Sequence, residues 1–357
     1  MNTLRAADAR DCAMLCTVTG EPGGFRMRAA WYEHGGPASE VLTVGEMEAP
    51  RPDPGEVLVR VRTSGVNPGE AKKRSDWMGF GIGYPRVVPH SDGAGTIERV
   101  GEGVTPSRVG ERVWVWGAQS GRPFGTAAEY TAVPKAQAVT LPDGVGFEAG
   151  ACLGIPAHTA HRCVFADGPV SGKVVLVAGG AGAVGSFAVS FAKWGAAEVV
   201  ATVGSEAHAE AVLEAGASHA LNYRAEDVAT RVREITEGSG VDRIVEVALG
   251  RNLAVDAEVI AQLGTIAAYS SDADAEPRLP FWDLLFKNVT IRLVGSDDLP
   301  EEAEHHAVED ISAALAARVL HPRIARRLPL ERIAEAHEAV DSGRAGGRVI
   351  LDIDGPA

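Results

Sequence analysis

The chain has 357 residues, of which 45% are hydrophobic and 23% are charged, the composition of an ordinary soluble globular protein. A chain of this length can bury at least one full core and more commonly buries two. Its 48 acidic residues outnumber its 34 basic ones, which gives a formal net charge of −14. This excess of negative charge disfavours nucleic acid and anionic membrane surfaces as partners of the whole chain.

No apolar run approaches the length of a membrane span and no signal segment opens the sequence, so we expect a cytoplasmic protein. The four cysteines, Cys12, Cys16, Cys152 and Cys163, are few and scattered. They fit unpaired thiols in a reducing compartment better than a disulfide framework. Cys12 and Cys16 lie four residues apart and no second pair follows, so their spacing does not predict a zinc site.

Residues 1–26 show no clear periodicity, and Pro22-Gly-Gly24 separates them from the first expected strand at residues 27–31. We interpret 1–26 as an N-terminal extension. Two alternatives stay open: Met27 is an alternative start behind a loosely held arm, or the extension is ordered and packs on the body.

The following region, to about residue 150, predicts a β domain. Val57, Val59 and Val61 alternate with basic residues, the pattern of a half-buried strand. Strands this short, each bounded by Gly or Pro, favour a small, partly open β barrel. The further expected strands lie at residues 96–100, 112–116, 127–133 and 138–141.

A glycine turn organises the second domain. Residues 174–177 are a β-branched, apolar run typical of a buried parallel strand, Gly180-x-Gly182-x-x-Gly185 follows, and a helical pattern covers 183–194. In this setting the three glycines predict a dinucleotide site: the first permits the tight turn, the second lets the backbone approach a pyrophosphate, and the third lets the helix pack on the strand. The helix N-terminus then faces the phosphates with free N–H groups. A glycine turn in a coenzyme-free protein is the alternative, which the strand–helix alternation that follows disfavours.

That alternation predicts a doubly wound parallel sheet and therefore an α/β fold. The expected strands are 198–203, 219–221, 241–247, 265–268 and 290–294, and the expected helices are 206–215, 228–236 and 253–263. Helices over 301–320 and 330–340 and a strand over 348–353 are too few for a core of their own, so we expect them to return to the first domain. The predicted division is 1–26, 27–150, 151–295 and 296–357.

Several motifs, in their order and spacing, resemble those of the zinc-free quinone oxidoreductases of the medium-chain dehydrogenase/reductase superfamily, the group that includes the lens zeta-crystallins. They are Gly65-Val-Asn-Pro68, His90-Ser-Asp-Gly-Ala-Gly95, Gly154-Ile-Pro156, Gly179-Gly-Ala-Gly-Ala-Val-Gly185, Asn222-Tyr-Arg224, Glu335-Ala-His-Glu338 and Gly347-Arg348. The resemblance covers nearly all of 27–353. It implies a GroES-like substrate domain split around a Rossmann domain, NADPH as hydride donor and usually a homodimer.

The resemblance also predicts that no metal takes part. Zinc relatives place a Cys, a His and a second Cys around a catalytic metal, and Asn67, Ser91 and Cys152 stand in those places here. One thiol of three cannot build a site that needs three protein ligands and an open position. His90, one place away from the ligand position, is interpreted as a pocket-lining or structural histidine.

The end of the second strand of the nucleotide domain favours NADPH over NADH. A protein that prefers NAD commonly carries Asp or Glu there to bind the ribose 2′-hydroxyl, and this chain has Val203. Gly204 and Ser205 follow and leave room for a 2′-phosphate, to which Ser205 can donate a hydrogen bond.

By resemblance, His208, Tyr223 and Arg224 lie near the same phosphate. The alternatives are a helix cap for Ser205 and solvated surface for His208 and Arg224, and Glu206 adds an unfavourable charge nearby. The predicted cofactor site comprises Gly180, Gly182, Ala183, Val184, Gly185, Gly204, Ser205, His208, Tyr223, Arg224, Leu249, Ser270 and Arg348.

We take Asn67 and Lys72 as the catalytic candidates. Relatives carry tyrosines shortly after the Val-Asn-Pro motif, in places that here hold Lys72 and Met78. Lys72, if it points inward, would stabilise negative charge on the acceptor oxygen as a preorganised cation. The alternative is that Lys72, Lys73 and Arg74 form a solvated helix face. By resemblance, Asn67 lies in the cleft and orients the nicotinamide or the substrate.

Trp77, Phe80 and Tyr84 form either an apolar wall for a planar acceptor or part of the core. The glycines among them predict a mobile loop. Asp92 is expected to fix the turn into the next strand.

The function that follows is NADPH-dependent hydride transfer to a quinone or similar conjugated carbonyl, without a metal. Two alternatives stay open: an enoyl or enone reductase of a specific metabolic pathway, which needs a proton donor at the substrate α-carbon, and a non-catalytic NADPH-binding protein.

Overall fold

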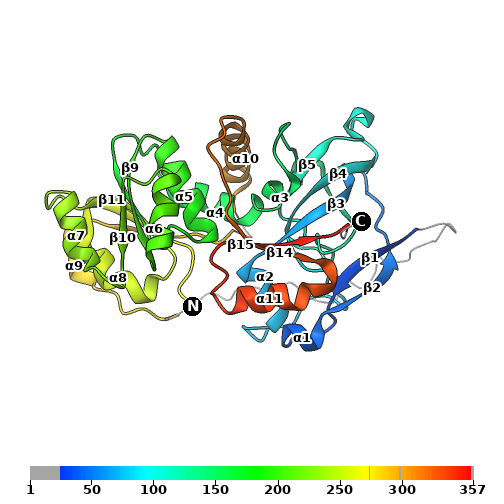
Figure 1. Cartoon of the computed structure of the whole chain (residues 1–357), viewed down its shortest axis with the longest axis horizontal. Helices are drawn as coiled ribbons and strands as arrows, with labels where there is room; N and C mark the ends of the chain where they lie inside the picture. Colours follow the sequence, from blue (N-terminus) through cyan, green and yellow to red (C-terminus); the bar gives the residue numbers. More distant parts are fainter. Residues whose placement is uncertain (1–24, 273, 297–298, 355–357) are drawn as a thin grey trace, which may run out of the picture.

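The computed structural model describes residues 25–272, 274–296 and 299–354. The predicted N-terminal extension, with Cys12 and Cys16, lies almost entirely outside these residues. Figure 1 shows two lobes side by side, with helices α4 (Gly154–Phe165) and α10 (Glu301–Ala316) where the lobes meet.

The nucleotide lobe is built on a parallel sheet of six strands in the order β10-β9-β8-β11-β12-β13. The strands are β8 (Val174–Val177), β9 (Glu198–Val203), β10 (His219–Asn222), β11 (Val241–Glu246), β12 (Ile260–Ala268) and β13 (Thr290–Leu293). The helices are α5 (Ala183–Trp194), α6 (Glu206–Glu214), α7 (Val228–Ile235), α8 (Leu249–Val259) and α9 (Phe281–Phe286). The strand order reverses between β8 and β11, where doubly wound sheets bind their ligands. The predicted doubly wound sheet is confirmed.

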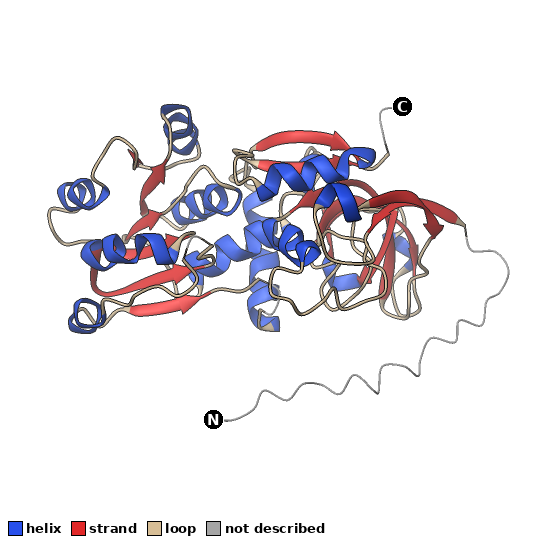
Figure 2. Cartoon of the chain, turned by 90° about the horizontal axis from the view of Figure 1, so that it is seen from below, coloured by secondary structure: helices blue, strands red, loops and turns tan. Residues whose placement is uncertain are grey.

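Both faces of this sheet are covered by helices, as Figure 2 shows. Val175 and Val177 pack in the core under α5, while Leu176 points to the opposite core under α8. Successive side chains of a strand point to opposite faces, so a strand buried on both sides reads as a continuous apolar run. This is why residues 174–177 could be predicted without a period-2 pattern.

The predicted helix before β12 is wrong by four residues at both ends, because α8 runs over Leu249–Val259 and β12 begins directly after it. A register shift against β11 leaves residues 261–264 bulging from the strand. In this bulge Leu263 has a φ of 61°, and its N–H donates to the Lys287 carbonyl at 2.7 Å. Gly264 therefore follows a bulge instead of ending a helix, because strand pairing overrides local periodicity.

The substrate lobe is a mixed sheet of seven strands in the order β14-β15-β3-β4-β5-β7, with β6 also paired to β3. A hairpin of β1 and β2 packs beside it. The strands are β1 (Arg26–Trp31), β2 (Thr43–Glu48), β3 (Glu56–Val66), β4 (Asp92–Val100), β5 (Arg112–Val115), β6 (Tyr130–Pro134), β7 (Ala138–Thr140), β14 (Ile324–Pro329) and β15 (Arg348–Asp352). The helices associated with it are α1 (Ala38–Val41), α2 (Pro68–Ser75), α3 (Phe147–Gly150) and α11 (Ile333–Asp341).

The C-terminal segment completes the sheet of the substrate lobe, since β15 pairs antiparallel with β3. In Figure 1 the orange and red ribbons of α11, β14 and β15 lie against the blue and cyan first lobe. The division at residues 27, 151 and 296 stays a prediction. The sequence did not predict α4, although its first residues form the Gly154-Ile-Pro156 motif.

Candidate active site

The glycine turn between β8 and α5 is held by close backbone contacts. A Cβ on Gly185 would lie 2.2 Å from the Gly179 carbonyl oxygen, and one on Gly180 would lie 2.8 Å from the Cβ of Ala201. Gly182 is the N-cap of α5 and supplies no capping side chain. The N–H groups at the start of α5, including those of Ala183 and Val184, are thus left for a ligand. The turn fits the pyrophosphate of a dinucleotide.

A second predicted group lies at the end of β9. A Cβ on Gly204 would lie 2.8 Å from the Tyr223 hydroxyl and 3.6 Å from Arg224 Nε. The Ser205 side chain makes no capping hydrogen bond to α6, so its interpretation as a helix cap is not supported. Glu206, the unfavourable charge of the prediction, accepts a hydrogen bond from Asn222 Nδ2 at 3.2 Å. We call Gly204, Ser205, Tyr223 and Arg224 the phosphate corner.

The remaining predicted cofactor residues are dispersed. His208 is half-buried, and its Nε2 faces the C-terminal segment, 3.9 Å from where a Cβ on Gly346 would lie. The Leu249 N–H donates to the Ser270 carbonyl at 3.1 Å, which brings these two residues together beyond the ends of β11 and β12.

In the substrate lobe, between β3 and α2, Asn67 lies at the centre of a buried polar network. Its Nδ2 donates to Glu70 Oε1 at 3.1 Å and to Asp92 Oδ2 at 2.8 Å, and its Oδ1 accepts from Arg348 Nη1 at 2.6 Å. Asp92 also accepts a hydrogen bond from the Ile155 N–H at 2.9 Å, which joins β4 to α4. Burial and the nearby Asp92 charge raise the pKa of Glu70 to about 7. We call Asn67, Glu70, Asp92 and Arg348 the polar floor.

This network changes two assignments. Arg348 was predicted to contact the nucleotide, but its side chain is only 2% exposed and its hydrogen bonds go to Val66, Asn67, Asp92 and Ala151 within the protein. The Asn67 amide is likewise saturated by protein partners and 1% exposed. Both residues hold the polar floor together and present almost no surface to a ligand.

The three places that hold zinc ligands in relatives have other partners here. The Ser91 N–H donates to Glu70 Oε1 at 2.7 Å, and the Cys152 thiol donates to the Glu148 carbonyl at 3.1 Å. Within residues 25–272, 274–296 and 299–354, no group of three or more His, Cys, Asp or Glu side chains could hold a metal ion.

His90 is a structural residue, as one of the two interpretations predicted. Its Nε2 lies 3.0 Å from Nε2 of His337 on α11, and its Nδ1 lies 2.8 Å from the Ser64 hydroxyl. Both imidazoles are fully buried. Burial lowers the pKa of His90 well below its ordinary value and that of His337 to about 3.

Lys72 connects the two lobes. From α2 its ammonium forms an ion pair with Asp272, in the segment after β12, and lies 5.3 Å from the centre of the Trp77 ring. Trp77 is 61% exposed and Phe80 81% exposed, so they are not core residues, and the apolar wall stays a prediction. The Tyr84 hydroxyl donates to the Gly121 carbonyl at 2.6 Å.

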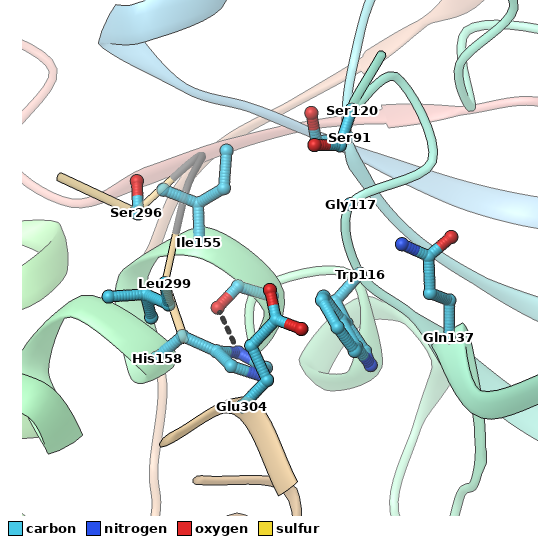
Figure 3. A pocket seen from close by; sticks show the side chains of 11 residues that line it. Ser91, Trp116, Gly117, Ser120, Gln137, Ile155, His158, Ser296, Leu299 and Glu304 are labelled. Atoms are coloured by element: carbon cyan, nitrogen blue, oxygen red, sulfur yellow. Dashed lines mark hydrogen bonds between the residues drawn. The ribbon is translucent and has the colours of Figure 1, made fainter. Parts of the chain in front are cut away.

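A pocket that the sequence did not predict lies where the lobes meet, and Figure 3 shows its lining. Its enclosed part has a volume of about 40 Å³, and the whole hollow spans about 420 Å³ when the open space at its mouth is counted. Its walls include Ser91 before β4, Trp116 after β5, Ile155 and His158 on α4, and Glu304 on α10. These residues come from four separated segments, so no local pattern signals the pocket. Of the residues named here, Ser91 and Ile155 lie within two of the motifs, and the others lie in none.

Comparison with known proteins gives the family. A profile described as the alcohol dehydrogenase GroES-like domain matches residues 53–143, and one described as zinc-binding dehydrogenase matches residues 183–312. The quinone oxidoreductase of Rattus norvegicus is 31% identical over 328 residues, which cover 90% of this chain and 96% of that protein. The chain belongs to the zeta-crystallin-like quinone oxidoreductase family. It is thus an oxidoreductase of the medium-chain dehydrogenase/reductase superfamily.

Two further relatives bear on the chemistry of this quinone oxidoreductase homologue. A 2-haloacrylate reductase of a Burkholderia species is 29% identical over 347 residues, covering 91% of this chain and 98% of the relative. A mycobacterial protein solved in complex with NADPH superposes with a TM-score of 0.77 at 26% identity, covering 92% of this chain and 100% of that one. The predicted fold class, a GroES-like β domain with a Rossmann domain, is confirmed, and this fold binds a pyridine nucleotide. No helix in the described part of the chain is long and apolar enough to cross a membrane.

Proposed function

We propose that the protein transfers hydride from NADPH to a quinone or a similar conjugated carbonyl without a metal. The observation that carries the choice of NADPH is the phosphate corner. The missing side chain of Gly204 lets the Tyr223 hydroxyl and the Arg224 guanidinium come close to the end of β9. Val203 stands where NAD-preferring proteins carry an acid, so no carboxylate at the strand end repels a phosphate, although the acid Glu206 lies nearby.

Bound NADPH would supply the hydride, and the chain supplies position and electrostatics. The N–H groups at the start of α5 bind the pyrophosphate, and the phosphate corner binds the 2′-phosphate. The polar floor fixes the backbone beneath the nicotinamide and acceptor. Negative charge that develops on the acceptor oxygen is stabilised by the Ser91 hydroxyl in the pocket and by the Lys72 ammonium when it leaves Asp272.

The test is NADPH oxidation by the purified protein with an aromatic ortho-quinone and with a conjugated enone, using NADH as the control donor. Arg224→Ala should raise KM for NADPH about tenfold and leave KM for NADH unchanged, because only NADPH carries the 2′-phosphate. Arg231→Ala is the matched control, since Arg231 is an exposed arginine of α7 that pairs with Glu226 and Glu234. An unchanged KM for NADPH in Arg224→Ala would contradict the phosphate corner.

A second candidate is a reductase of conjugated alkenes in one pathway, favoured by the similarity to the 2-haloacrylate reductase. Turnover of the enone but not of the quinone would select it. Tight NADPH binding without oxidation by either acceptor would instead indicate a non-catalytic nucleotide-binding protein.

We also propose a cytoplasmic homodimer formed through the edge of the nucleotide lobe. Among the described strands β13 forms one of the two edges of the parallel sheet, and apolar side chains on it and on the preceding helix α9 are exposed: Leu293 by 75%, Phe286 by 71% and Trp282 by 65%. An apolar patch at a sheet edge marks an association surface. Light scattering should give a dimer for the wild type and a monomer for Leu293→Asp/Phe286→Asp, and a monomeric wild type would refute the proposal.

A further inference from the structure

His158 projects from α4 into the pocket with one ring nitrogen satisfied and the other free of partners. Its Nδ1 lies 2.8 Å from the Gly154 carbonyl oxygen, one turn earlier in the helix, as the dashed line in Figure 3 shows. A carbonyl only accepts, so Nδ1 carries the hydrogen of this bond. Nε2 is buried and has no hydrogen-bond partner among the described residues.

The protonation state of this imidazole follows from its burial. His158 is only 3% exposed, and burial lowers its pKa to about 4. The ring is therefore neutral near pH 7, with its hydrogen on Nδ1 and a lone pair on Nε2. A buried acceptor without a partner is unfavourable, so Nε2 favours a ligand that brings a hydrogen-bond donor.

Two residues beside His158 determine the shape and the charge of the pocket wall: Trp116 and Glu304. The Trp116 ring centre lies 4.9 Å from the His158 ring centre with planes inclined by 35°, which forms a flat aromatic side. Glu304 stands in front of the imidazole in Figure 3 and is the one acidic residue in the described lining, which contains no Lys or Arg. Burial raises the pKa of Glu304 above its ordinary value, and the negative charge of Glu301 raises it further. The pocket thus offers acceptors and no cation to a ligand.

We propose that this pocket selects a neutral conjugated ketone that also carries a hydroxyl group, and that the hydroxyl donates to His158 Nε2 while the ring lies against Trp116. Nε2 is shielded from bulk water, so the hydroxyl reaches it as the Glu304 side chain turns aside. A carboxylate substrate is disfavoured because it would meet Glu304 without a compensating cation. The inference rests on the proposed function and names its substrate class.

The test compares 2-cyclohexenone, 4-hydroxy-2-cyclohexenone and 2-chloroacrylate with NADPH. For the wild type we expect kcat/KM about tenfold higher for the hydroxylated enone than for the plain one, the value of one hydrogen bond, and the lowest kcat/KM for 2-chloroacrylate. His158→Phe should abolish the preference without changing the NADPH dissociation constant, and His158→Gln, which keeps an acceptor oxygen, should restore part of it. An unchanged preference in His158→Phe, or a preference for 2-chloroacrylate, would overturn the inference.

A binding measurement separates this inference from the proposed function. If neither enone is reduced, the proposed function fails, and the pocket is tested with 4-hydroxycyclohexanone and cyclohexanone, which lack the conjugated bond. In ¹⁵N-histidine-labelled protein, the Nε2 resonance of His158, assigned by its loss in His158→Phe, should shift with the hydroxylated ketone alone. Equal shifts with both ketones, or no shift with either, would overturn the inference.

Discussion

The glycine turn lies in the nucleotide lobe and the polar floor in the substrate lobe, and the two are built in opposite ways. The turn is made of consecutive residues, and it depends on missing side chains, as the 2.2 Å approach to the Gly179 oxygen shows. The floor joins residues up to 281 positions apart and depends on side chains that satisfy one another, such as Arg348 and Asn67. Adding a side-chain atom to a glycine should therefore distort the glycine turn, and removing a polar side-chain group should destabilise the polar floor.

The largest effect is expected from Arg348→Met. It leaves Asp92 buried without this arginine, and breaking a buried pair costs roughly 3–5 kcal/mol. Denaturant unfolding should show this loss in the free energy of unfolding. Arg326→Met on the adjacent β14 is the control, because Arg326 is 51% exposed and should contribute less than about 1 kcal/mol. Similar losses in both variants would refute the structural role of the polar floor.

The second-largest effect is expected from Gly185→Ala, which changes the glycine turn. Its Cβ collides with backbone, so the turn must shift, at a cost of about 1–3 kcal/mol and with at least a tenfold weaker NADPH affinity. NADPH fluorescence titration measures the affinity. Gly69→Ala, whose Cβ meets nothing within 4 Å, is the matched control and should bind normally. Normal binding by Gly185→Ala would refute the close-packed turn.

Acid should weaken the substrate lobe through the buried His90–His337 pair. The folded pKa of His337, about 3, lies below the value near 6.5 of the unfolded chain, so the unfolded chain binds the extra proton. Stability is complete above pH 6.5 and falls toward pH 3, by up to about 1.4 kcal/mol per pH unit. Unfolding measured from pH 7 to 5 should show a shallower decrease in His337→Asn. Identical slopes would contradict this role of the pair.

Lys72→Met tests the contact between the two lobes and should have the smallest effect on stability, since its ion pair is partly exposed. If the ammonium stabilises the acceptor oxygen, kcat/KM falls about tenfold or more. Asp272→Asn is the discriminating partner variant, because it frees Lys72 and should retain or raise kcat/KM. Equal losses in both variants would mean that the ion pair matters only for the position of the lobes.

The sequence by itself determined the elements whose causes are local. Three consecutive elements were predicted within a residue: the strand at 174–177, the glycine turn and the helix ended by Gly195. Their causes are burial on both faces of the strand and the backbone freedom of glycine, and both depend on residues that are adjacent in the sequence. That Tyr223 and Arg224 lie close to Gly204 was expected from the family resemblance, and they follow β10, which is the neighbour of β9 in the sheet.

Tertiary structure decided the rest, because it depends on which distant segments meet. Arg348 reads as a surface cation in sequence, and only the pairing of β15 with β3 buries it beside Asn67. The bulge at Leu263 follows from register with β11, which local periodicity does not contain. The pocket around His158 forms only where β5, α4 and α10 converge, and the free Nε2 depends on a carbonyl one turn away and on burial by both lobes. Hydrogen-bond satisfaction and burial are properties of the assembled fold, so they could not be predicted from the order of the residues alone.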